Sequence, residues 1–561
     1  MAQVENWPRK YLTEIHAGRI IADRKITAVY EREVGWMDNP PPDFPFRFDP
    51  LLAQYHIDFM QTFCKQSQGR AGGKGIRFEL FQLAKLMLIF GWIEKDTGLR
   101  RFREAVDIRG RKNGKSTESS AVAHDMLEND GESGPQVYCV ANSRDQAKQV
   151  FTEACNMRAQ SPALKAITKK RQGDIYCPIN FGVMKPLAAK TNNLDGLNAS
   201  MVIQDEWHEQ KDSSLYDVMK QSQSYRDQPL YWMISTNGFV REGFFDSKYA
   251  YASSVALWEE GFHDYRMLPL IYELDRKDEW TDEAMWVKAN PGLGTIKKVQ
   301  TLRDYVEQAK RDPSFLPTVL TKDFNLPENS SANWLPYDDC VNQAAVKMEY
   351  LEHSYAIGGC DLSATTDLTC ATLLIVKPQD DHYYVLQKYF IPQSKIDALD
   401  ATRSDREAPY RRWAELGFLR ICSGSTVDYN DVTQWFVEMV QKHDIRPLWV
   451  CYDAALSGYW APQMVEYGFD MEKIRQGPFT WTYPMKLLGG ALHDHRVVYQ
   501  NNPVLRWCLC NTAVKTMNKD GIESIQPVKC ASNRRIDGMV SLLNAWTGLQ
   551  NHIDEYLPYV R

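Results

Sequence analysis

The chain has 561 residues, of which 44% are hydrophobic and 25% charged, the composition of a folded soluble protein. This length predicts about three or four domains. A formal net charge of −6 gives no sign of nucleic-acid binding, so DNA contact would depend on local basic clusters, such as those within 165–171 and 534–535. No apolar stretch approaches the ~20 residues that span a bilayer, and the N-terminus has no signal-peptide core. The twelve scattered cysteines predict reduced thiols and a cytoplasmic protein without membrane contact.

Residues 1–60 are rich in proline, tryptophan and charge, and we predict that they form an N-terminal extension. From 61 to 330, strand-like runs alternate with helical ones. The expected helices cover 78–92 and 116–129, with another from Ser143, and the expected strands cover 104–108, 136–141, 200–205 and 230–235. This alternation predicts a mostly parallel sheet with helices on both faces and ligands at the strand C-termini. Within it, the charged segment 240–325 is predicted to form a subdomain that covers the ligand.

A phosphate-binding loop is predicted at 109–117, which reads R-G-R-K-N-G-K-S-T between the strand over 104–108 and the next helix. In such a turn the backbone N–H groups and the helix N-terminus hold phosphate oxygens, while Lys115 reaches the β- and γ-phosphates and Ser116 ligates Mg²⁺. Arg109 replaces the usual leading glycine. The predicted ATP-binding residues of the loop are Gly110, Arg111, Lys112, Asn113, Gly114, Lys115, Ser116 and Thr117.

A second half of the same site is predicted at 201–206, which reads M-V-I-Q-D-E. An apolar run that ends in two acids is typical of a buried strand. It would deliver Asp205 to the metal of a bound nucleotide and Glu206 to the attacking water. A lone G-K-S is a weak signal, but its pairing with this strand favours a nucleoside triphosphatase over a chance loop beside a capped strand.

The pattern restarts in the C-terminal part of the chain. Residues 331–350 follow the polar P-E-N-S-S-A stretch (327–332) and are predicted to be a linker. Residues 351–561 are predicted to form a second α/β domain. Its expected strands cover 355–361, 369–376, 383–390 and 448–453, and its expected helices cover 430–443 and 535–549.

Three aspartates occupy the ends of these elements. Asp361 and Asp453 end strands, and Asp537 lies in the first turn of the last helix. Carboxylates placed in this way can converge and hold two Mg²⁺ or Mn²⁺ ions, which stabilise the attacking and leaving oxygens of a phosphodiester displacement. A hairpin and a further strand with acids at these places is the plan of ribonuclease-H-like nucleases. The plainer alternative is that each aspartate caps an element, and Asp367 is either an accessory ligand or a turn residue.

Together these segments resemble the large terminase subunit of tailed bacteriophages and related prophages, from about residue 45 to the C-terminus. The resemblance implies an N-terminal P-loop (RecA/ASCE-like) ATPase domain followed by a C-terminal ribonuclease-H-like nuclease domain. Its marks, in order, are G-R-K-N-G-K-S (110–116), V-Y-C-V-A and S-R-D-Q-A (137–147), M-V-I-Q-D-E (201–206), I-S-T-N-G (234–238), K-A-N-P (288–291), G-C-D-L-S-A-T-T-D-L (359–368), Y-D (452–453) and R-I-D-G (535–538).

The resemblance also implies roles for matching residues. Arg111 would stabilise charge on the γ-phosphate, an effect worth ~10³–10⁵ in rate in related chemistry, and Gln82 would read the adenine edge with its amide. Ser235, Thr236 and Asn237 would form the coupling segment that senses the γ-phosphate. The plainer alternatives are an exposed loop arginine, a polar surface glutamine and a strand-ending turn. The nuclease metal ligands would be Asp361, Asp453 and Asp537.

This family implies a motor that uses ATP with Mg²⁺ to thread double-stranded DNA through the portal into a procapsid, and a two-metal nuclease that cuts concatemers. Its partners would be DNA, the portal protein, the small terminase subunit and further copies in a ring, in the cytoplasm of an infected bacterial host. One alternative is an ATP-dependent helicase-nuclease, which would need a second RecA-like domain. Another is a catalytically silent assembly protein, which the intact Lys115, Glu206 and Asp361 argue against.

Overall fold

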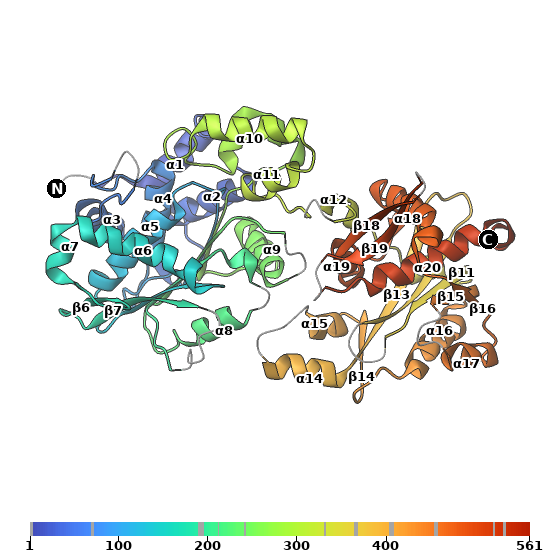
Figure 1. Ribbon diagram of the computed structural model, residues 1–561. Helices are drawn as coiled ribbons and strands as arrows, with labels where there is room; N and C mark the ends of the chain where they lie inside the picture. The colour runs from blue at the N-terminus through green and yellow to red at the C-terminus, as the bar shows by residue number, and fades with distance from the viewer. Residues whose placement is uncertain are drawn as a thin grey trace. The chain divides into compact units, whose positions relative to one another are not determined.

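The computed structural model divides into two compact units, fewer than the three or four domains that the length predicts. Unit 1 comprises residues 1–240 and 244–327, and unit 2 comprises residues 241–243 and 328–561 (Figure 1). Asp367, predicted as an accessory ligand or a turn residue, lies outside the described residues. The structure describes residues 4–68, 72–188, 196–210, 213–239, 243–329, 333–363, 368–402, 409–453, 458–519, 522–530 and 534–560.

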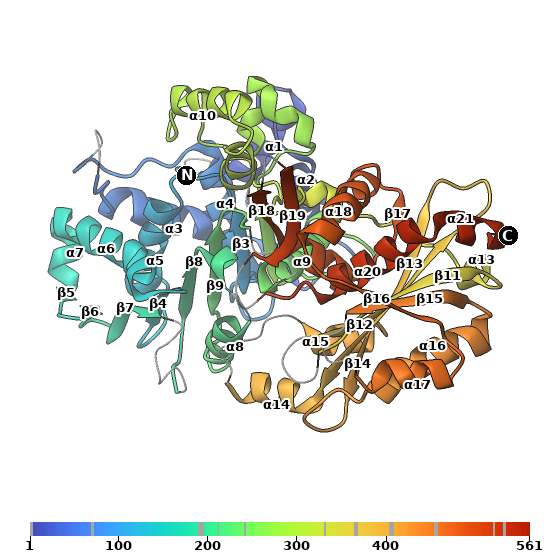
Figure 2. The same cartoon turned by 45° about the vertical axis from the view of Figure 1, so that its right-hand side comes forward.

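Unit 1 is built on an eight-stranded sheet in the order β10-β3-β9-β8-β4-β7-β6-β5 (Figure 2). The six strands from β10 to β7 run parallel. β6 pairs antiparallel with β7, and β5 pairs antiparallel with β6. The strands are β3 (Glu104–Ile108), β4 (Gln136–Ala141), β5 (Lys169–Lys170), β6 (Ile175–Cys177), β7 (Gly182–Ala188), β8 (Met201–Asp205), β9 (Leu230–Ser235) and β10 (Met267–Ile271). The four predicted strands are confirmed, and only the third begins one residue late.

The order of the central strands places the site. β9 lies between β3, which leads into the phosphate loop, and β8, which ends in the two acids. This insertion of one strand between the two is the arrangement of RecA-like ATPases, so the predicted fold class of this unit is confirmed. Because β3, β8 and β9 are parallel, their C-terminal ends meet at one edge of the sheet, where ligands bind in such folds.

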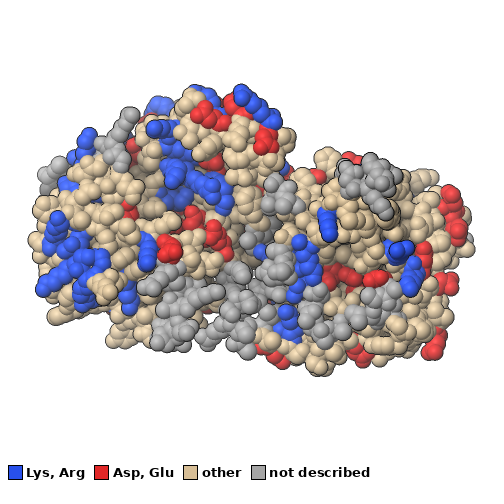
Figure 3. All heavy atoms as spheres, in the orientation of Figure 1, with Lys and Arg blue, Asp and Glu red and all other residues tan. Residues whose placement is uncertain are grey.

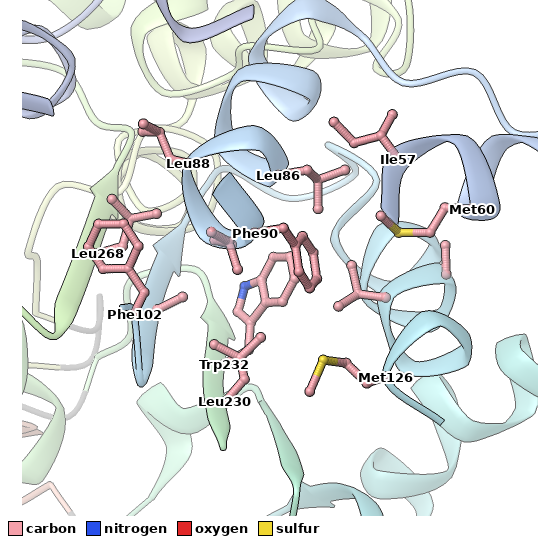
Figure 4. Close-up of a cluster of buried hydrophobic side chains, with 14 of the residues drawn as sticks. Ile57, Met60, Leu86, Leu88, Phe90, Phe102, Met126, Leu230, Trp232 and Leu268 are labelled. Atoms are coloured by element: carbon pink, nitrogen blue, oxygen red, sulfur yellow. The ribbon is translucent and has the colours of Figure 1, made fainter. Parts of the chain in front are cut away.

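The core of unit 1 lies between the sheet and a layer of helices. The helix α4 (Leu80–Gly91) is apolar on nearly every side, so it is buried between α3 (Pro50–Phe63), α5 (Lys115–Glu128) and the strands. Figure 4 shows Leu86 and Phe90 of α4 directed toward Trp232 of β9 and Met126 of α5. This packing fixes the first turn of α5, and therefore the phosphate loop, against the sheet.

Residues 1–60, predicted as an extension, contribute to this same core. They contain α1 (Trp7–His16), α2 (Arg24–Asp38), the short strand β1 (Phe46–Phe48) and most of α3, and Tyr11 and Tyr30 are buried with the helices of the main layer. Arg101, which precedes β3, forms an ion pair of 2.7 Å with Glu33, and both side chains are buried. The N-terminal segment is therefore part of the folded unit that carries the phosphate loop.

The segment 240–325, predicted as a covering subdomain, consists of two parts in the structure. Its first part, α9 (Phe244–Leu257) and β10, packs with the main sheet. A separate small core, from Leu274 to Phe324, is formed by two 3₁₀ turns, α10 (Val299–Arg311) and α11 (Leu316–Lys322). Only this second part has a core of its own.

Unit 2 has a mixed sheet in the order β14-β13-β12-β11-β15-β16. β11, β12 and β13 are antiparallel, while β15 is parallel to β11 and β16 to β15. Apart from the edge strand β14, the order β13-β12-β11-β15-β16 corresponds to 3-2-1-4-5 when these five strands are numbered along the chain. This is the order of ribonuclease-H-like domains, which confirms the fold class predicted for this part of the chain. The strands are β11 (Tyr355–Asp361), β12 (Thr369–Val376), β13 (Tyr383–Pro392), β14 (Leu419–Cys422), β15 (Arg446–Asp453) and β16 (Met471–Ile474).

Helices cover both faces of this sheet (Figure 2). α16 (Tyr429–His443) and α17 (Trp460–Glu466) pack on one face, and α18 (Pro478–His493), α19 (Pro503–Cys510) and α20 (Asp537–Asn551) pack on the other. The two predicted helices are confirmed within two residues at each end. Alternate residues of β11 enter the two cores, with Ala356 in one and Ile357 in the other.

The predicted linker, 331–350, contains α12 (Tyr337–Cys340) and begins α13 (Met348–Leu351). Leu335 and Cys340 are buried in the core of unit 2, so the described part of this segment belongs to that unit. The hairpin β18 (Thr512–Lys519) and β19 (Ile522–Lys529) was not predicted. In the described part of the chain, no helix is long and apolar enough to cross a membrane.

Candidate active sites

The phosphate loop joins β3 to α5 at the C-terminal edge of the unit 1 sheet. Gly114 has φ of 78° and Lys112 has φ of 64°, so the chain turns twice before the helix begins, once at a residue without a Cβ. The ammonium of Lys115 donates to the backbone oxygens of Arg109 (2.6 Å) and Gly110 (3.2 Å). Burial, together with the charge of Arg109, lowers the pKa of Lys115 to about 8. A polyanionic ligand beside this ammonium would favour its charged form.

Arg109 stands where the usual loop has glycine, and the structure shows why an arginine fits. Its guanidinium is fully buried and pairs with Asp107 (2.8 Å) and Glu118 (2.7 Å), and Lys85 pairs with the same two acids at 2.6 and 2.8 Å. Two cations and two anions therefore balance inside the unit. Arg109 also donates to the backbone oxygen of Asn113 (3.2 Å), which holds the loop from within.

The segment K-A-N-P (288–291) holds the loop from the other side. Asn113 donates to the side-chain oxygen of Asn290 (2.9 Å) and accepts from the backbone of Gly292 (3.0 Å). The backbone N–H of Gly110 donates to Ala289 (2.9 Å). A Cβ at Gly110 would lie 2.4 Å from Asn290 Oδ1 and 2.5 Å from the Asp323 carbonyl, so only glycine fits there.

The two acids after β8 differ in their protonation. Asp205 is buried, and this burial, with the nearby charge of Glu206, raises its pKa to about 7. Burial also raises the pKa of Glu206, but the close imidazole of His208, 3.0 Å from its carboxylate, and the charges of Lys115 and Lys322 outweigh it and lower that pKa to about 2. Glu206 adopts a left-handed backbone conformation with φ of 48°, which turns it out of the strand direction. Glu206 is thus ionised at neutral pH, whereas Asp205 is close to half protonated.

Ser235 of the predicted coupling segment and Glu206 both lie next to His208, a residue that the sequence patterns did not mark. Nδ1 of His208 lies 2.7 Å from Ser235 Oγ and 3.0 Å from Glu206 Oε2, and its Nε2 lies 2.6 Å from the ammonium of Lys322. Lys322 also donates to the Asn237 carbonyl (3.0 Å). A histidine two residues after the acids was the only available signal, and nothing in the sequence marked Lys322.

The other predicted nucleotide residues lie around the loop. Gln82 is buried in the first turn of α4, where its oxygen accepts from the Glu79 backbone (3.0 Å), and its Nε2 is 3.9 Å from the Cβ position at Gly114. Arg111 is exposed, and its N–H donates to the Lys322 carbonyl (2.9 Å). Thr117 donates to Glu153 (3.4 Å). Their roles toward a nucleotide stay predictions.

In unit 2, the three predicted aspartates lie at the ends of neighbouring elements. Cys360 of β11 is paired with Tyr452 of the parallel β15, so Asp361 and Asp453 follow at the C-terminal ends of adjacent strands. Asp537 opens α20, which packs on β11, β12 and β15, and it is 6% exposed, while the other two are half-buried. Strand order and helix packing therefore place all three carboxylates on elements that contact one another.

Helix α20 is held against β11 by hydrogen bonds from polar side chains, and glycines without a Cβ let the elements approach closely. Ser541 donates to the carbonyls of Gly359 (3.2 Å) and Cys370 (3.1 Å), and Asn544 donates to that of Cys360 (3.0 Å). A Cβ at Gly359 would lie 2.2 Å from the Ser541 carbonyl, so this glycine permits the close approach. In R-I-D-G (535–538), a Cβ at Gly538 would lie 2.1 Å from the Tyr389 hydroxyl.

One group of three metal-ligand side chains within 4.8 Å of one another occurs among the described residues, and it is Asp380, Asp381 and His382. It lies in the turn between β12 and β13, where Asp380 accepts from Tyr350 (2.9 Å) and Tyr384 (2.6 Å). Asp361, Asp453 and Asp537 do not form such a group. Three carboxylates are nevertheless the oxygen donors that Mg²⁺ and Mn²⁺ prefer.

A RecA-like ATPase unit followed by a ribonuclease-H-like unit with acids at its strand ends defines a two-enzyme chain that couples a nucleotide motor to a nuclease. Two family models match it. The terminase large subunit ATPase domain covers residues 80–254, and the terminase large subunit endonuclease domain covers 262–552, which begins within unit 1. The chain belongs to the large terminase subunit family, and it is therefore an ATPase and a nuclease of viral genome packaging. A helicase-nuclease would need a second RecA-like domain, and unit 2 is a ribonuclease-H-like domain instead.

The chain is also similar to individual proteins. The large terminase subunit of Enterobacteria phage HK97 is 26% identical over 507 residues, which are 87% of this chain and 93% of that protein. Protein YmfN of Escherichia coli (strain K12) is 25% identical over 363 residues, 63% of this chain and 77% of that protein. The crystal structure of the HK97 bacteriophage large terminase aligns at 22% identity with a TM-score of 0.49, covering 88% of this chain and 99% of that one.

Proposed function

We propose that ATP hydrolysis takes place at the loop of unit 1. Lys115 and Ser116 would bind the β- and γ-phosphates and the Mg²⁺ of the nucleotide, and Asp205 would support that metal. Mg²⁺ would neutralise charge on the phosphates. The observation that carries this proposal is that Lys115 and Glu206 follow β3 and β8, which are parallel strands on either side of β9, so both lie at the same edge of the sheet.

Glu206 would orient the attacking water. A carboxylate with a pKa of about 2 is ionised throughout the physiological range. It is a strong hydrogen-bond acceptor but a weak base, so it would hold and polarise the water rather than remove its proton fully before attack. Arg111 would face the developing charge on the γ-phosphate, because its side chain is exposed at the loop. Gln82, buried beside Gly114, would contact the adenine.

For the nuclease of unit 2, we propose that Asp361, Asp453 and Asp537 hold two Mg²⁺ or Mn²⁺ ions. Bound there, such ions would supply Lewis-acid chemistry and neutralise charge at the scissile phosphate. The protein would supply the spacing of the carboxylates, because α20 is tied to β11 by Ser541 and Asn544. The support is the placement of all three acids at the ends of contacting elements.

We propose that the substrate is double-stranded DNA and that the partners are the portal protein, the small terminase subunit and further copies of this chain in a ring. The proposed location is the cytoplasm of an infected bacterial host. A basic surface in unit 1 supports DNA contact, since Figure 3 shows lysine and arginine side chains gathered around α7 (Pro162–Ile167) and the β5–β7 edge. Lys165, Lys169 and Lys170 belong to these elements. Such side chains bind phosphates without reading sequence.

The test is to incubate supercoiled plasmid with the protein and Mg²⁺ or Mn²⁺, and to measure nicking and ATP turnover together. Lys115→Ala should abolish turnover and leave nicking, whereas Asp361→Ala should abolish nicking and leave turnover. The activity that a variant loses should fall by about 10²- to 10³-fold, because each substitution removes a group that stabilises charge at the reacting phosphate directly or by holding a metal ion. If nicking survives Asp361→Ala, the metal site of unit 2 is wrongly assigned.

A further inference from the structure

The strongest unassigned feature of unit 1 is a buried polar chain that begins at Glu206. His208 is 4% exposed, and its ring lies against Gly238, where a Cβ would be 2.7 Å from His208 Cδ2. Phe245 packs edge-on to the same ring. Because the ring has no room to turn, its two nitrogens point to fixed partners.

The partners determine which nitrogen carries the proton. The ammonium of Lys322 has only donors, so Nε2 of His208 accepts from it (2.6 Å) and Nδ1 carries the hydrogen. That single N–H is bonded to Ser235 Oγ (2.7 Å), and Glu206 Oε2 lies 3.0 Å from the same nitrogen without a hydrogen bond to it. Because the ring is fixed, a turn of the Glu206 carboxylate into line with this N–H would give it a second acceptor, and therefore a second arrangement. A group with two discrete arrangements is what transmission between sites requires.

The far end of the chain reaches the phosphate loop. The carbonyl of Lys322 accepts from the N–H of Arg111 (2.9 Å). Three residues on, Asn325 accepts from the backbone of Asn237 (3.1 Å), and its carbonyl accepts from the Asn237 side chain (2.9 Å). The last turn of α11 and the residues after it therefore contact both the loop that would bind phosphate and the segment predicted to couple hydrolysis to movement.

We propose that His208 is a positioning residue that couples Glu206 to Ser235, with Lys322 holding its ring and relaying the arrangement to Arg111. This inference rests on the proposed role of Glu206. While Glu206 holds the attacking water with one oxygen, its other oxygen turns toward the His208 N–H and competes with Ser235 for it. When the water is consumed, the N–H returns to Ser235, which is the hydrogen bond that the structure contains, and β9 receives the change at its C-terminal end. His208 touches neither nucleotide nor water in this scheme.

The experiment compares ATP turnover and nucleotide affinity in His208→Ala, Ser235→Ala and the double variant. We expect His208→Ala to lower kcat about 100-fold, in the range of lost positioning of a catalytic group, with the Kd of a fluorescent ADP analogue within about threefold. His208→Asn keeps a donor near the Nδ1 position and should recover about tenfold of that loss. Coupling through Ser235 predicts that the double variant falls no further than His208→Ala alone.

Matched variants separate this role from folding. His56 is also buried and bonded to a carboxylate, Asp125 at 2.7 Å, so His56→Asn should leave kcat within about twofold. Lys322→Met keeps the apolar stem and the carbonyl that binds Arg111, and it should reproduce the kcat loss if His208→Ala fails to fold. The inference is overturned if kcat stays within twofold in both His208→Ala and Lys322→Met, or if the losses of the double variant multiply.

Glu206→Gln distinguishes this inference from the proposal beneath it. If Glu206→Gln retains turnover, the assignment of Glu206 is wrong and the coupling falls with it. If Glu206→Gln abolishes turnover while the His208 and Lys322 variants do not change kcat, the ATPase assignment stands and only the coupling is refuted.

Discussion

The two units stabilise the surroundings of their functional residues in opposite ways. In unit 1, the charges around the phosphate loop are buried and already balanced, with Arg109 and Lys85 paired to the same two carboxylates. In unit 2, Asp361, Asp453 and Asp537 stand at the ends of elements that are joined by apolar packing and by hydrogen bonds between side chains and backbone. One site is shaped by its own ion pairs, and the other by the sheet and helix beneath it.

This difference follows from what each site must bind. A phosphate loop has to present its backbone N–H groups before a nucleotide arrives, so ties among its own residues stabilise the empty shape. A set of carboxylates gains its order from cations, because the acids repel one another until a metal binds. Substitutions of the ties should therefore damage unit 1 through stability, and substitutions that move α20 should damage unit 2 through cutting alone.

The largest effect is expected from Arg109→Gly, which restores the glycine of the usual loop. Removing one partner of a buried ion-pair network leaves uncompensated charge and destabilises by about 3–5 kcal/mol. We therefore expect a lower midpoint of thermal unfolding and loss of ATP turnover, followed by circular dichroism and phosphate release. Arg19→Gly, which removes an arginine 61% exposed in its ion pair with Glu14, should leave the midpoint unchanged. A stable, active Arg109→Gly would show that the ion pairs do not shape the loop.

Arg109 also shows which features of the site can be predicted from the sequence and which cannot. The loop, the strand ending in Asp205 and the three unit 2 aspartates followed from residue type and spacing, because local patterns determine strands, helices and their ends. The sequence shows Arg109 only as a replacement of the usual leading glycine, although it lies at the centre of a buried network. Its partner Glu118 is nine residues away, but Lys85 comes from another helix, and no local pattern shows such a meeting.

His208 and Lys322 illustrate the same limit more strongly. They are 114 residues apart in sequence, and their contact depends on α11 reaching the end of β8. The same holds for residues 1–60, whose composition predicts an extension, although Tyr11 and Tyr30 are buried in the core of unit 1. Contacts between elements distant in sequence come from tertiary packing, which single-sequence patterns do not encode.

The second prediction concerns the contact between the loop and K-A-N-P. In Gly110→Ala, the added methyl group would overlap Asn290 Oδ1 and the Asp323 carbonyl, which lie 2.4 and 2.5 Å from its position. Overpacking of this kind costs about 1–3 kcal/mol, so nucleotide affinity should fall about 10- to 100-fold in a titration with a fluorescent ADP analogue. Gly35→Ala in α2 meets nothing within 4 Å and should leave affinity unchanged. Wild-type affinity in Gly110→Ala would contradict a tightly held loop.

The third prediction tests the opposite case in unit 2. Asn544→Ala removes the hydrogen bond to the Cys360 carbonyl, next to Asp361, and leaves a buried acceptor without that donor, an effect of about 1–3 kcal/mol. Plasmid nicking should fall about tenfold, with ATP turnover unchanged. Asn551→Ala, at the other end of the same helix, removes an exposed contact to Glu472 and should change neither activity. Equal losses in nicking and turnover would mean that the two sites are not supported separately.

The smallest effect concerns protons at Asp205, an acid beside the phosphate loop that the neighbouring charges leave poorly compensated. Burial raises its pKa to about 7 in the empty site, and a metal ligand must be ionised, so binding of Mg²⁺ with nucleotide displaces a proton. At pH 7 the release should be about half a proton, because half of the molecules carry it. Below the pKa, affinity should fall about tenfold per pH unit, and above pH 8 it should level off as far as Asp205 is concerned. Lys115, with a pKa of about 8, is already mostly charged at pH 7 and takes up few protons when nucleotide binds.

Calorimetric titrations at one pH in two buffers of different ionisation enthalpy measure this proton release directly. Identical heats in the two buffers would show that Asp205 is ionised before the metal arrives, and the contrast between a balanced loop and an unbalanced acid beside it would then disappear.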